Sequence, residues 1–450
     1  MTEKTLSFYE KNIVVFKVGA IGFLILLLLI PMSMIDSLVM ERKARQMEAA
    51  NEISSKWGFE QKLTGPVLAV PYMLIEPGQK QGEVITSAHT AYFLPEMLKV
   101  DGKINPEVRN RGLFKVAVYS STLKVEGNFK APIFNQGNKQ IVINWKEAYI
   151  TIGIPDLRGI RENINFNWND KSMTCEPGVK SNEIVESGVT VNNILTEAPN
   201  EADYKFSFDI ALNGSRGISF IPVGKETNVS IASTWANPSF DGSFLPYERH
   251  ISEKGFDAKW KVLELNRNYP QKWVDDKVNL ESSAFGVSLL LPIETYQITE
   301  RSMKYAILFI ALTFMTFFFV EVLRKMRVHP IQYVLVGFGL LLFYLLLLSL
   351  SEQMSFNMAY LIATIGIVTM ITSYSYSIFK NTRLTTILSS ILILLYGFLF
   401  VLLQLQDYAL LMGSIGLFLI LSSVMYLSRK INWYAINGGK ADNEITNTRE

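Results

Sequence analysis

Long uncharged stretches dominate the last third of the chain. The clearest one runs from Ile331 to Ser351 without a single charged side chain. An α-helix needs about 20 predominantly apolar residues to cross the hydrocarbon layer of a bilayer. A helix on the surface of a soluble protein would keep a polar stripe, and this stretch has none. Because lipid offers no hydrogen-bond partners to the backbone, the stretch is predicted to form a continuous membrane helix.

Several other segments share this character. We expect one membrane helix over 18–40 and a bundle of five within 304–430, over 305–323, 328–351, 353–379, 384–406 and 408–428. The first segment is interpreted as an uncleaved helix, because its apolar core is longer than that of a signal peptide and no small-x-small cleavage site follows it. Short turns between the last five helices predict that they pack as antiparallel neighbours.

The chain between the first two helices has a different period. After a short polar helix expected over 41–56, apolar and polar residues alternate strictly over 123–130, 204–210 and 256–262. Strict alternation is typical of strands with one buried face. Further strand candidates are 67–75, 84–94, 113–120, 141–154, 218–223, 228–235 and 285–291. Residues 41–303 are therefore predicted to be an antiparallel β-rich, sandwich-like domain of one or two units.

Two details of this domain are further expectations. The dipeptide Asp101-Gly102 is a turn signal, and 165–200, rich in Asn, Glu and Ser, is expected to be a long loop or a joint between sub-domains. The fold class is thus a membrane protein with six transmembrane helices and a large β-rich ectodomain between the first and second helices.

The charged residues that flank the helices predict the orientation. Basic residues mark the ends expected to be cytoplasmic, and Glu352 and Asp407 mark two tight external turns. These basic residues are Arg324, Lys325, Arg327, Lys380, Arg383, Arg429 and Lys430. The expected result is a multi-pass protein of the bacterial inner membrane, with cytoplasmic tails at 1–17 and 431–450 and a periplasmic ectodomain. Arg42, Lys43 and Arg45 argue the other way, since they follow the first helix on its outer side.

Composition narrows the possible partners. Hydrophobic residues make up 49% of the chain and the formal net charge is only +2, so the lipid bilayer is an expected partner and nucleic acid is not. The single cysteine, Cys175, cannot form an internal disulfide and is interpreted as a bystander. The ectodomain must then be stabilised by core burial alone.

The search for catalytic chemistry gives few candidates. His89, His250 and His329 are not spaced as metal ligands, and the chain has no C-x-x-C, G-x-S-x-G or G-x-x-x-x-G-K motif. We therefore predict no catalytic residue, metal site or cofactor, and a protein that is not an enzyme. Glu321 lies near the inner end of its helix, where it is expected to snorkel to the interface rather than line an ion pathway. The hydroxyls of Ser373, Ser375 and Ser377 are expected to serve helix packing.

Several segments resemble those of one family. They are HPIQYVLVGFGLLLFYLLLLSLSEQMSFNMAYLIA at 329–363, LTGPVLAVPY at 63–72, FLPE at 93–96, NPEVRNRGLFKVAVY at 105–119, DLRGI at 156–160 and GFDAKW at 255–260. Together they resemble the CreD family of bacterial inner-membrane proteins over nearly the whole chain. The resemblance implies an envelope protein induced by a two-component system and associated with envelope integrity and colicin tolerance. It supplies no catalytic residues.

Charged residues beside glycines in these segments are candidate partner sites. Arg109, Arg111, Asp156 and Arg158 either form a surface for a partner or stabilise loops at strand ends. His329 precedes Pro330, and proline is favoured in the first turn of a helix, so this pair is expected to begin one.

Three functions remain open from the sequence. The first is a non-enzymatic protein that supports envelope integrity and stress or colicin tolerance, with an envelope protein or a second copy as partner. The second is a transporter of a small or lipidic substrate, with a polar cavity at Tyr344 and the three serines. The third is a membrane-embedded enzyme that modifies the envelope, with Glu352 and Asp407 as candidate groups.

Overall fold

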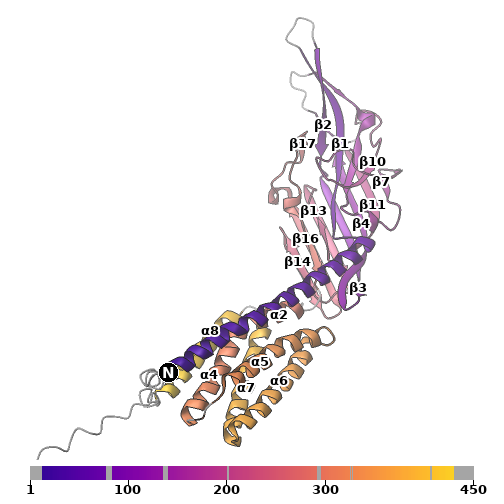
Figure 1. Ribbon diagram of the computed structural model, residues 1–450. Coiled ribbons are helices and arrows are strands. Elements are labelled where there is room, and N and C mark those ends of the chain that lie inside the picture. Colours follow the sequence, from indigo (N-terminus) through magenta and orange to yellow (C-terminus); the bar gives the residue numbers. More distant parts are fainter. Residues whose placement is uncertain are drawn as a thin grey trace, which may run out of the picture. The chain divides into compact units, whose positions relative to one another are not determined.

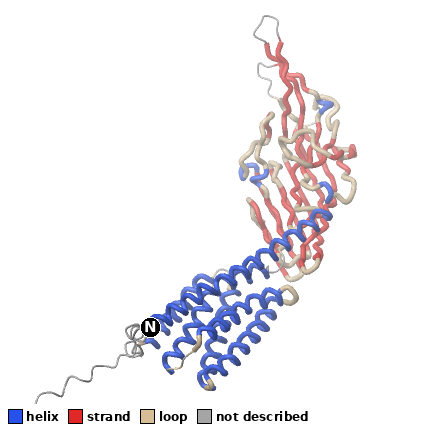
Figure 2. Tube along the Cα trace, viewed as in Figure 1, coloured by secondary structure: helices blue, strands red, loops and turns tan. Residues whose placement is uncertain are grey.

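The computed structural model describes residues 13–77, 84–134, 140–199, 202–290, 295–324, 326, 328–405 and 408–429. The chain divides into two compact units. One comprises Met1–Arg45 with Ile293–Glu450, and the other comprises Gln46–Pro292. Figure 2 shows that helices dominate the first unit and strands the second, and the two are called the helical unit and the β unit below.

The helical unit contains the predicted spans. Its helices are α2 (Ile13–Trp57), α3 (Thr295–Lys304), α4 (Ala306–Arg324), α5 (Pro330–Ser351), α6 (Phe356–Phe379), α7 (Thr382–Gln404) and α8 (Ala409–Ser428). Within the described residues, five helices are long and apolar enough to span a membrane, and α3 with α4, bent by 45°, makes a sixth if the pair is one span. The number agrees with the six helices predicted.

The first helix differs from the prediction. Separate helices were expected over 18–40 and 41–56, but α2 is one continuous helix of 45 residues whose last part, from Gln46, belongs to the β unit. The polar segment has a high share of good helix formers (Glu, Lys, Arg, Ala and Met), so nothing in it stops the helix before Gly58. The domain limit expected at residue 303 also differs, because α3 lies within the helical unit.

Among the five helices that are long enough to span a membrane by themselves, α5 has the largest buried share. It contacts α3, α4 and α6, and its Gly337 lies so close to α2 that a Cβ atom there would be 2.3 Å from Leu28. Phe343 on the same helix packs against the rings of Tyr360 and Tyr396, at centroid distances of 5.3 and 4.7 Å. The stretch without a polar stripe is therefore enclosed by neighbouring helices on one side (Figure 1).

The β unit is built from two sheets. The ten-stranded sheet has the order β14–β18–β12–β1–β6–β10–β9, with β2 and β5 also paired to β1 and β17 paired to β2. These strands are β14 (Pro238–Gly242), β18 (Phe285–Leu289), β12 (Gly217–Phe220), β1 (Gln61–Pro77), β6 (Tyr149–Gly153), β10 (Gly188–Val191), β9 (Glu176–Pro177), β2 (Val84–Phe93), β5 (Gln140–Ile143) and β17 (Lys272–Val274).

The eight-stranded sheet has the order β15–β16–β13–β3–β4–β11–β7–β8. Its strands are β15 (Glu248–Ser252), β16 (Gly255–Leu263), β13 (Glu226–Ser233), β3 (Met97–Arg111), β4 (Phe114–Lys130), β11 (Asp203–Ser215), β7 (Asn165–Trp168) and β8 (Lys171–Thr174). Buried side chains of both sheets form one continuous core, from Val67 on β1 to Trp260 on β16. The β-rich prediction is confirmed, and the question of one or two units resolves to one.

Three details of the β prediction were wrong. The sheets are mixed rather than purely antiparallel, because β1 pairs with β12 and β3 with β13 in parallel. Asp101-Gly102 lies inside β3, where a Cβ on Gly102 would be 2.6 Å from side-chain atoms of Ile231 and Leu123, so this glycine relieves crowding instead of forming a turn. Residues 165–199 contain the short strands β7 to β10 rather than one long loop.

Candidate functional site

Four of the predicted site residues gather around the last turn of α2. Asp156 begins a short 3₁₀ turn, Leu157–Gly159, and its carboxylate accepts hydrogen bonds from the backbone N–H of Phe59 at 3.0 Å and of Arg158 at 3.2 Å. The Arg158 guanidinium binds the same carboxylate through Nε at 2.8 Å and Nη2 at 3.1 Å. Burial raises the pKa of Asp156, but these donors together outweigh it and hold the pKa below its usual value.

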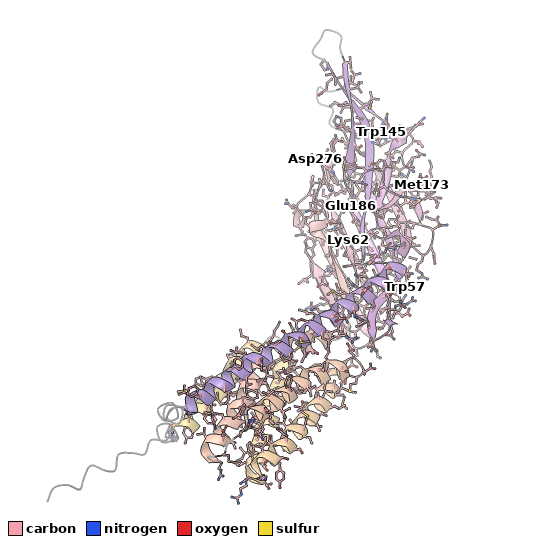
Figure 3. The ribbon with its side chains drawn as sticks, viewed as in Figure 1. Trp57, Lys62, Trp145, Met173, Glu186 and Asp276 are labelled. Atoms are coloured by element: carbon pink, nitrogen blue, oxygen red, sulfur yellow. The ribbon has the colours of Figure 1, made fainter. Side chains whose placement is uncertain are left out.

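The arginines bind the helix end directly. Arg158 also donates to the carbonyl of Ser55 at 2.9 Å, one of the last-turn carbonyls that lack a partner within a helix. Arg111 pairs with Glu52 at 3.0 Å, and the Arg109 guanidinium lies 3.7 Å from the ring centroid of Trp57. Figure 3 labels Trp57, the last residue of α2.

Close backbone contacts complete this arrangement. Gly58 has φ +137°, and a Cβ on Gly58 or Gly159 would be 2.6 or 2.4 Å from the carbonyl oxygen of Asn213. Ser54 and Ser215 are buried and share a hydrogen bond of 2.7 Å, while Trp57 Nε1 donates to the carbonyl of Tyr119 at 3.0 Å. We call this the helix anchor, comprising Glu52, Ser54, Ser55, Trp57, Gly58, Phe59, Arg109, Arg111, Asp156, Arg158 and Ser215.

The helix anchor bears on the two interpretations of the arginines. Arg109, Arg111 and Arg158 contact α2 or the residues next to it, so the interpretation that they stabilise the ends of elements accounts for their positions. The segments 105–119 and 156–160, which carried part of the family resemblance, supply most of this anchor.

Glu352 lies in a separate charged cluster of the helical unit. Its carboxylate accepts a hydrogen bond from the Tyr296 hydroxyl at 2.9 Å and lies 3.8 Å from Arg42. Close by in sequence, Lys43 pairs with Glu300 at 3.5 Å. Two of the basic residues that contradicted the orientation rule therefore have acidic partners. Asp407 lies outside the described residues, so its pairing with Glu352 as a catalytic group stays a prediction.

The prediction that Glu321 snorkels to the membrane interface was wrong. Its side chain is only 3% exposed, so it does not snorkel to an interface. It forms an ion pair with Lys17 and accepts hydrogen bonds from the Tyr333 hydroxyl and the Val328 N–H, both at 3.1 Å. The reason is that Lys17, expected in a cytoplasmic tail, belongs to helix α2 and reaches the carboxylate.

The remaining helical candidates form hydrogen bonds at or within their own helices. His329 precedes α5 and its Nδ1 accepts from the N–H of Ile331 at 3.3 Å, which confirms that it begins the helix with Pro330. The hydroxyl of Ser375 donates to the carbonyl of Ile371 at 2.6 Å, and that of Ser377 to Ser373 at 3.4 Å. These bonds within one helix are the packing role expected of such serines.

A groove at one end of the eight-stranded sheet was not found from the sequence. It has a volume of about 540 Å³ and lies where β16, β13, β3, β4 and β11 begin or end. Its lining residues are Glu96, Met97, Asn128, Lys130, Asp203, Lys225, Glu226, Leu263, Glu264 and Leu265. Leu265 is 94% exposed, and Met97 and Leu263 are also exposed. The signal available in the sequence was Leu265 itself, an apolar residue between Glu264 and Asn266 just after a strand.

Glu96 holds the basic residues of this groove. Lys130 lies 3.3 Å from its carboxylate and Lys225 lies 4.0 Å from it. Glu226 pairs with Lys261 at 2.9 Å. Asp203 and Glu264 add two further carboxylates to the lining, so the groove combines exposed apolar side chains with an acidic rim.

The described residues were also searched for a metal site and a reactive thiol. Across the described ranges, no group of three or more His, Cys, Asp or Glu side chains is arranged to hold a metal ion. Burial raises the pKa of the Cys175 thiol to about 11, which keeps the thiol protonated near neutral pH.

Comparison with known proteins identifies the family. The family described as "Inner membrane protein CreD" matches residues 13–434. The chain belongs to the CreD family. A relative in Escherichia coli (strain K12), named inner membrane protein CreD, is 34% identical over 433 residues and is matched over 95% of both chains.

The matches among solved structures are weak. A crystal structure of an M1 zinc metallopeptidase from Deinococcus radiodurans is 10% identical with a TM-score of 0.18, and the match covers 38% of each chain. A two-domain M1 zinc metallopeptidase mutant bound to L-arginine gives 9% identity, a TM-score of 0.19 and coverage of 44% of this chain and 42% of that one. These scores are too low to inform on the function of a CreD-family protein.

Proposed function

We propose that this CreD-family protein supports the integrity of the cell envelope, and tolerance of colicins and other envelope stress, by binding an envelope protein at the groove of the β unit. The observation that carries the proposal is Leu265, a leucine 94% exposed at the rim of that groove. Met97 and Leu263 beside it are exposed as well, and neighbouring exposed apolar side chains with a polar rim are typical of protein-binding sites. Binding at this groove requires no reaction.

The chemistry of the groove suggests the form of its partner. Met97, Leu263 and Leu265 offer apolar contact, and the carboxylates of Asp203 and Glu264 offer negative charge. A partner segment with a short apolar stretch and neighbouring Lys or Arg residues would complement both features. We propose an envelope protein that carries such a segment, and a second copy of this chain is an alternative outcome of the test.

The proposed location follows from charge. We propose that both chain ends lie in the cytoplasm and that the β unit lies in the periplasm, because basic residues mark the predicted cytoplasmic ends. Arg42 pairs with Glu352 and Lys43 with Glu300, so two of the three basic residues that follow the first helix have acidic partners. A reporter enzyme fused after residue 450 should be active only in its cytoplasmic form, and periplasmic activity would reverse the proposed orientation.

The test compares two exposed leucines. A strain lacking the gene is complemented with Leu265→Asp or with the matched control Leu245→Asp, whose leucine is 67% exposed outside the groove. Loss of an interface anchor costs about 2 kcal/mol, or roughly 30-fold in affinity, so Leu265→Asp should fail to restore survival in detergent and colicin. Leu245→Asp should restore it. Equal complementation by both variants, at equal protein levels, would refute the groove as the functional site.

Photo-crosslinking in intact cells identifies the partner. A crosslinker in place of Leu265 should capture one envelope protein reproducibly, and Glu264→Lys should abolish that capture by reversing charge at the rim. A crosslinker in place of Leu245 should not capture it. Crosslinks between two copies of this chain would instead assign the groove to self-association.

Transport and lipid chemistry have weaker support. The transport hypothesis placed a polar cavity at Tyr344 and three serines, but Ser375 and Ser377 donate to carbonyls of their own helix. The enzyme hypothesis used Glu352, which lies beside Arg42 and Tyr296. Binding through the β unit is therefore the function that the described contacts favour.

A further inference from the structure

Three side chains that belong neither to the groove nor to the helix anchor form a continuous chain of hydrogen bonds. Ser87 Oγ lies 2.7 Å from His89 Nε2, and His89 Nδ1 contacts Asp275 Oδ2. The second oxygen of Asp275 accepts a hydrogen bond from the N–H of Thr90 at 2.7 Å. The order of atoms, hydroxyl to Nε2 and Nδ1 to carboxylate, is that of a Ser-His-Asp triad, which is recognised by geometry and not by sequence position.

The fold positions each member. Ser87 and His89 are two residues apart on β2, so the strand presents both side chains on one face. Strand β17 pairs with β2 as far as Val274 opposite Ala91, and Asp275 follows immediately. Figure 3 labels the next residue, Asp276.

The backbone holds Asp275 in an uncommon conformation. Its φ is +51°, and its N–H donates to the carbonyl of Thr90 at 3.1 Å. Left-handed conformations of residues other than glycine often occur at functional sites. The ring of Tyr72, opposite His89 on β1, stacks on the imidazole at a centroid distance of 5.4 Å. The imidazole is thus oriented from two sides.

We infer that Ser87 is the nucleophile of a Ser-His-Asp site that hydrolyses carboxylic esters. His89 acts as the general base, and Asp275 is a positioning residue that holds the imidazole in the tautomer with the proton on Nδ1. Ser87 and His89 are both partly exposed, so an ester can reach the hydroxyl from solvent.

The reaction balances in two steps. Ser87 Oγ forms a bond to the ester carbonyl carbon while His89 Nε2 takes the hydroxyl proton, and the ester C–O bond breaks as that proton passes to the departing alcohol. Water then attacks the acyl-serine, giving its proton to His89, which returns it to Ser87 as the carboxylic acid leaves. No other reactant is required.

A backbone donor is available for the oxyanion. The N–H and C=O of Thr90 face Asp275, away from β1, and by the alternation of strands the N–H of Ala88 points to the same side. Among the described strands, β17 is the one that pairs with β2 on this side, and its pairing stops at Ala91. The N–H of the residue after a nucleophilic serine commonly helps to stabilise the oxyanion. A single backbone donor favours esters over amides, whose leaving groups are poorer.

The test uses a fluorophosphonate probe and para-nitrophenyl acetate on the full chain purified in detergent. Mass spectrometry should find the probe on Ser87, and Ser87→Ala should abolish both labelling and the enzyme-dependent release of nitrophenol. The matched control is Ser239→Ala, because Ser239 is a partly exposed serine whose Oγ donates to the carboxylate of Asp241 at 2.8 Å without a histidine. That variant should label and hydrolyse like the wild type.

The positioning role is tested separately. Asp275→Asn should slow labelling by at least about tenfold, as expected when the wrong imidazole tautomer is favoured, while Asp275→Glu should recover part of the rate. Melting temperatures of all variants show whether each is folded.

Two results would overturn the inference. One is a folded wild type that carries no probe on Ser87, and the other is a folded Ser87→Ala variant with the wild-type hydrolysis rate. In either case the hydrogen-bond chain serves to fasten β17 to β2, and Ser87→Ala and His89→Gln should lower the melting temperature alone. Leu265→Asp should leave labelling unchanged, so the outcome is independent of binding at the groove.

Discussion

Two carboxylates hold helix α2, one in each unit, and their surroundings differ. Glu321 in the helical unit is 3% exposed, and it binds Lys17, the Tyr333 hydroxyl and the N–H of Val328. Asp156 in the β unit is similarly buried, with 8% of its side chain exposed, but its partner Arg158 is 57% exposed. Each carboxylate accepts bonds from one cation and at least one backbone N–H.

The difference lies in where the positive charge is solvated. Arg158 keeps much of its guanidinium in water, so removal of Asp156 would leave a solvated cation. Glu321 sits among apolar helices, where an unpaired charge is expensive. We expect the same pairing of acid and base to contribute more to stability in the helical unit, because Glu321 is buried and Lys17, 35% exposed, is less exposed than Arg158.

Glu321→Ala should have the largest effect. The substitution removes the charge that compensates Lys17 and leaves the Tyr333 hydroxyl and the Val328 N–H without their acceptor. It should lower the free energy of unfolding by about 3–5 kcal/mol. The measurement is the apparent melting temperature of the full chain in detergent. Glu41→Ala, which breaks an exposed pair with Arg45, is the control and should change it little. A small effect of Glu321→Ala would mean that the two carboxylates are equivalent.

Asp156→Ala should have the second-largest effect. It should lower the free energy of unfolding by about 2–3 kcal/mol, because hydrogen bonds to a charged group are lost while Arg158 remains solvated. The effect should depend on pH. The folded-state pKa of Asp156 is depressed, so its contribution is present above the unfolded value near 3.8 and is lost as pH falls through the folded value. The difference in melting temperature between wild type and variant should shrink below about pH 4. A difference that stays constant on acidification would contradict a role for the charge.

Gly159→Ala should cost about 1–3 kcal/mol, since its Cβ would lie 2.4 Å from both the Asn213 carbonyl oxygen and Gln61 Nε2. Gly366→Ala in α6 is the matched control, because nothing lies within 4 Å of its Cβ position. Melting curves of the two variants should separate clearly. Equal curves would show that the helix anchor can relax around a methyl group.

Arg109→Ala should have the smallest effect, about 0.5–1 kcal/mol, the usual contribution of an exposed cation–π contact. Tryptophan fluorescence of Trp57 and the melting temperature report it. Arg109→Lys should retain part of the contact, because an ammonium still binds the ring face. A loss as large as that of Asp156→Ala would place Arg109 among the main supports of the anchor.

The sequence predicted what depends on local pattern. Alternation over 204–210 located β11, and the uncharged stretch from Ile331 located α5, because strand faces and membrane helices are encoded by neighbouring residues. Asp101-Gly102 was wrongly predicted to be a turn. A glycine is required there because Ile231, on another strand, leaves no room for a side chain.

The candidate site was predicted less completely, for a physical reason. Lys17 and Glu321 are 304 residues apart, and His89 and Asp275 are 186 apart, so only the fold brings each pair together. Asp156 and Arg158 were singled out as charged residues beside a glycine, yet they bind the end of α2, which no spacing within 156–160 encodes. Residues that are distant in the sequence and meet only in the folded protein cannot be recognised as one site from the sequence pattern.

The single, partly buried thiol makes the chain suitable for site-specific spectroscopy. Because the pKa of Cys175 is raised to about 11, only about one molecule in ten thousand carries the reactive thiolate at pH 7. A cysteine introduced in place of Leu265 would titrate near the ordinary value of about 8.5 and react with a maleimide or a nitroxide far faster. Probes of the groove can therefore be attached to the natural sequence without first removing its own cysteine.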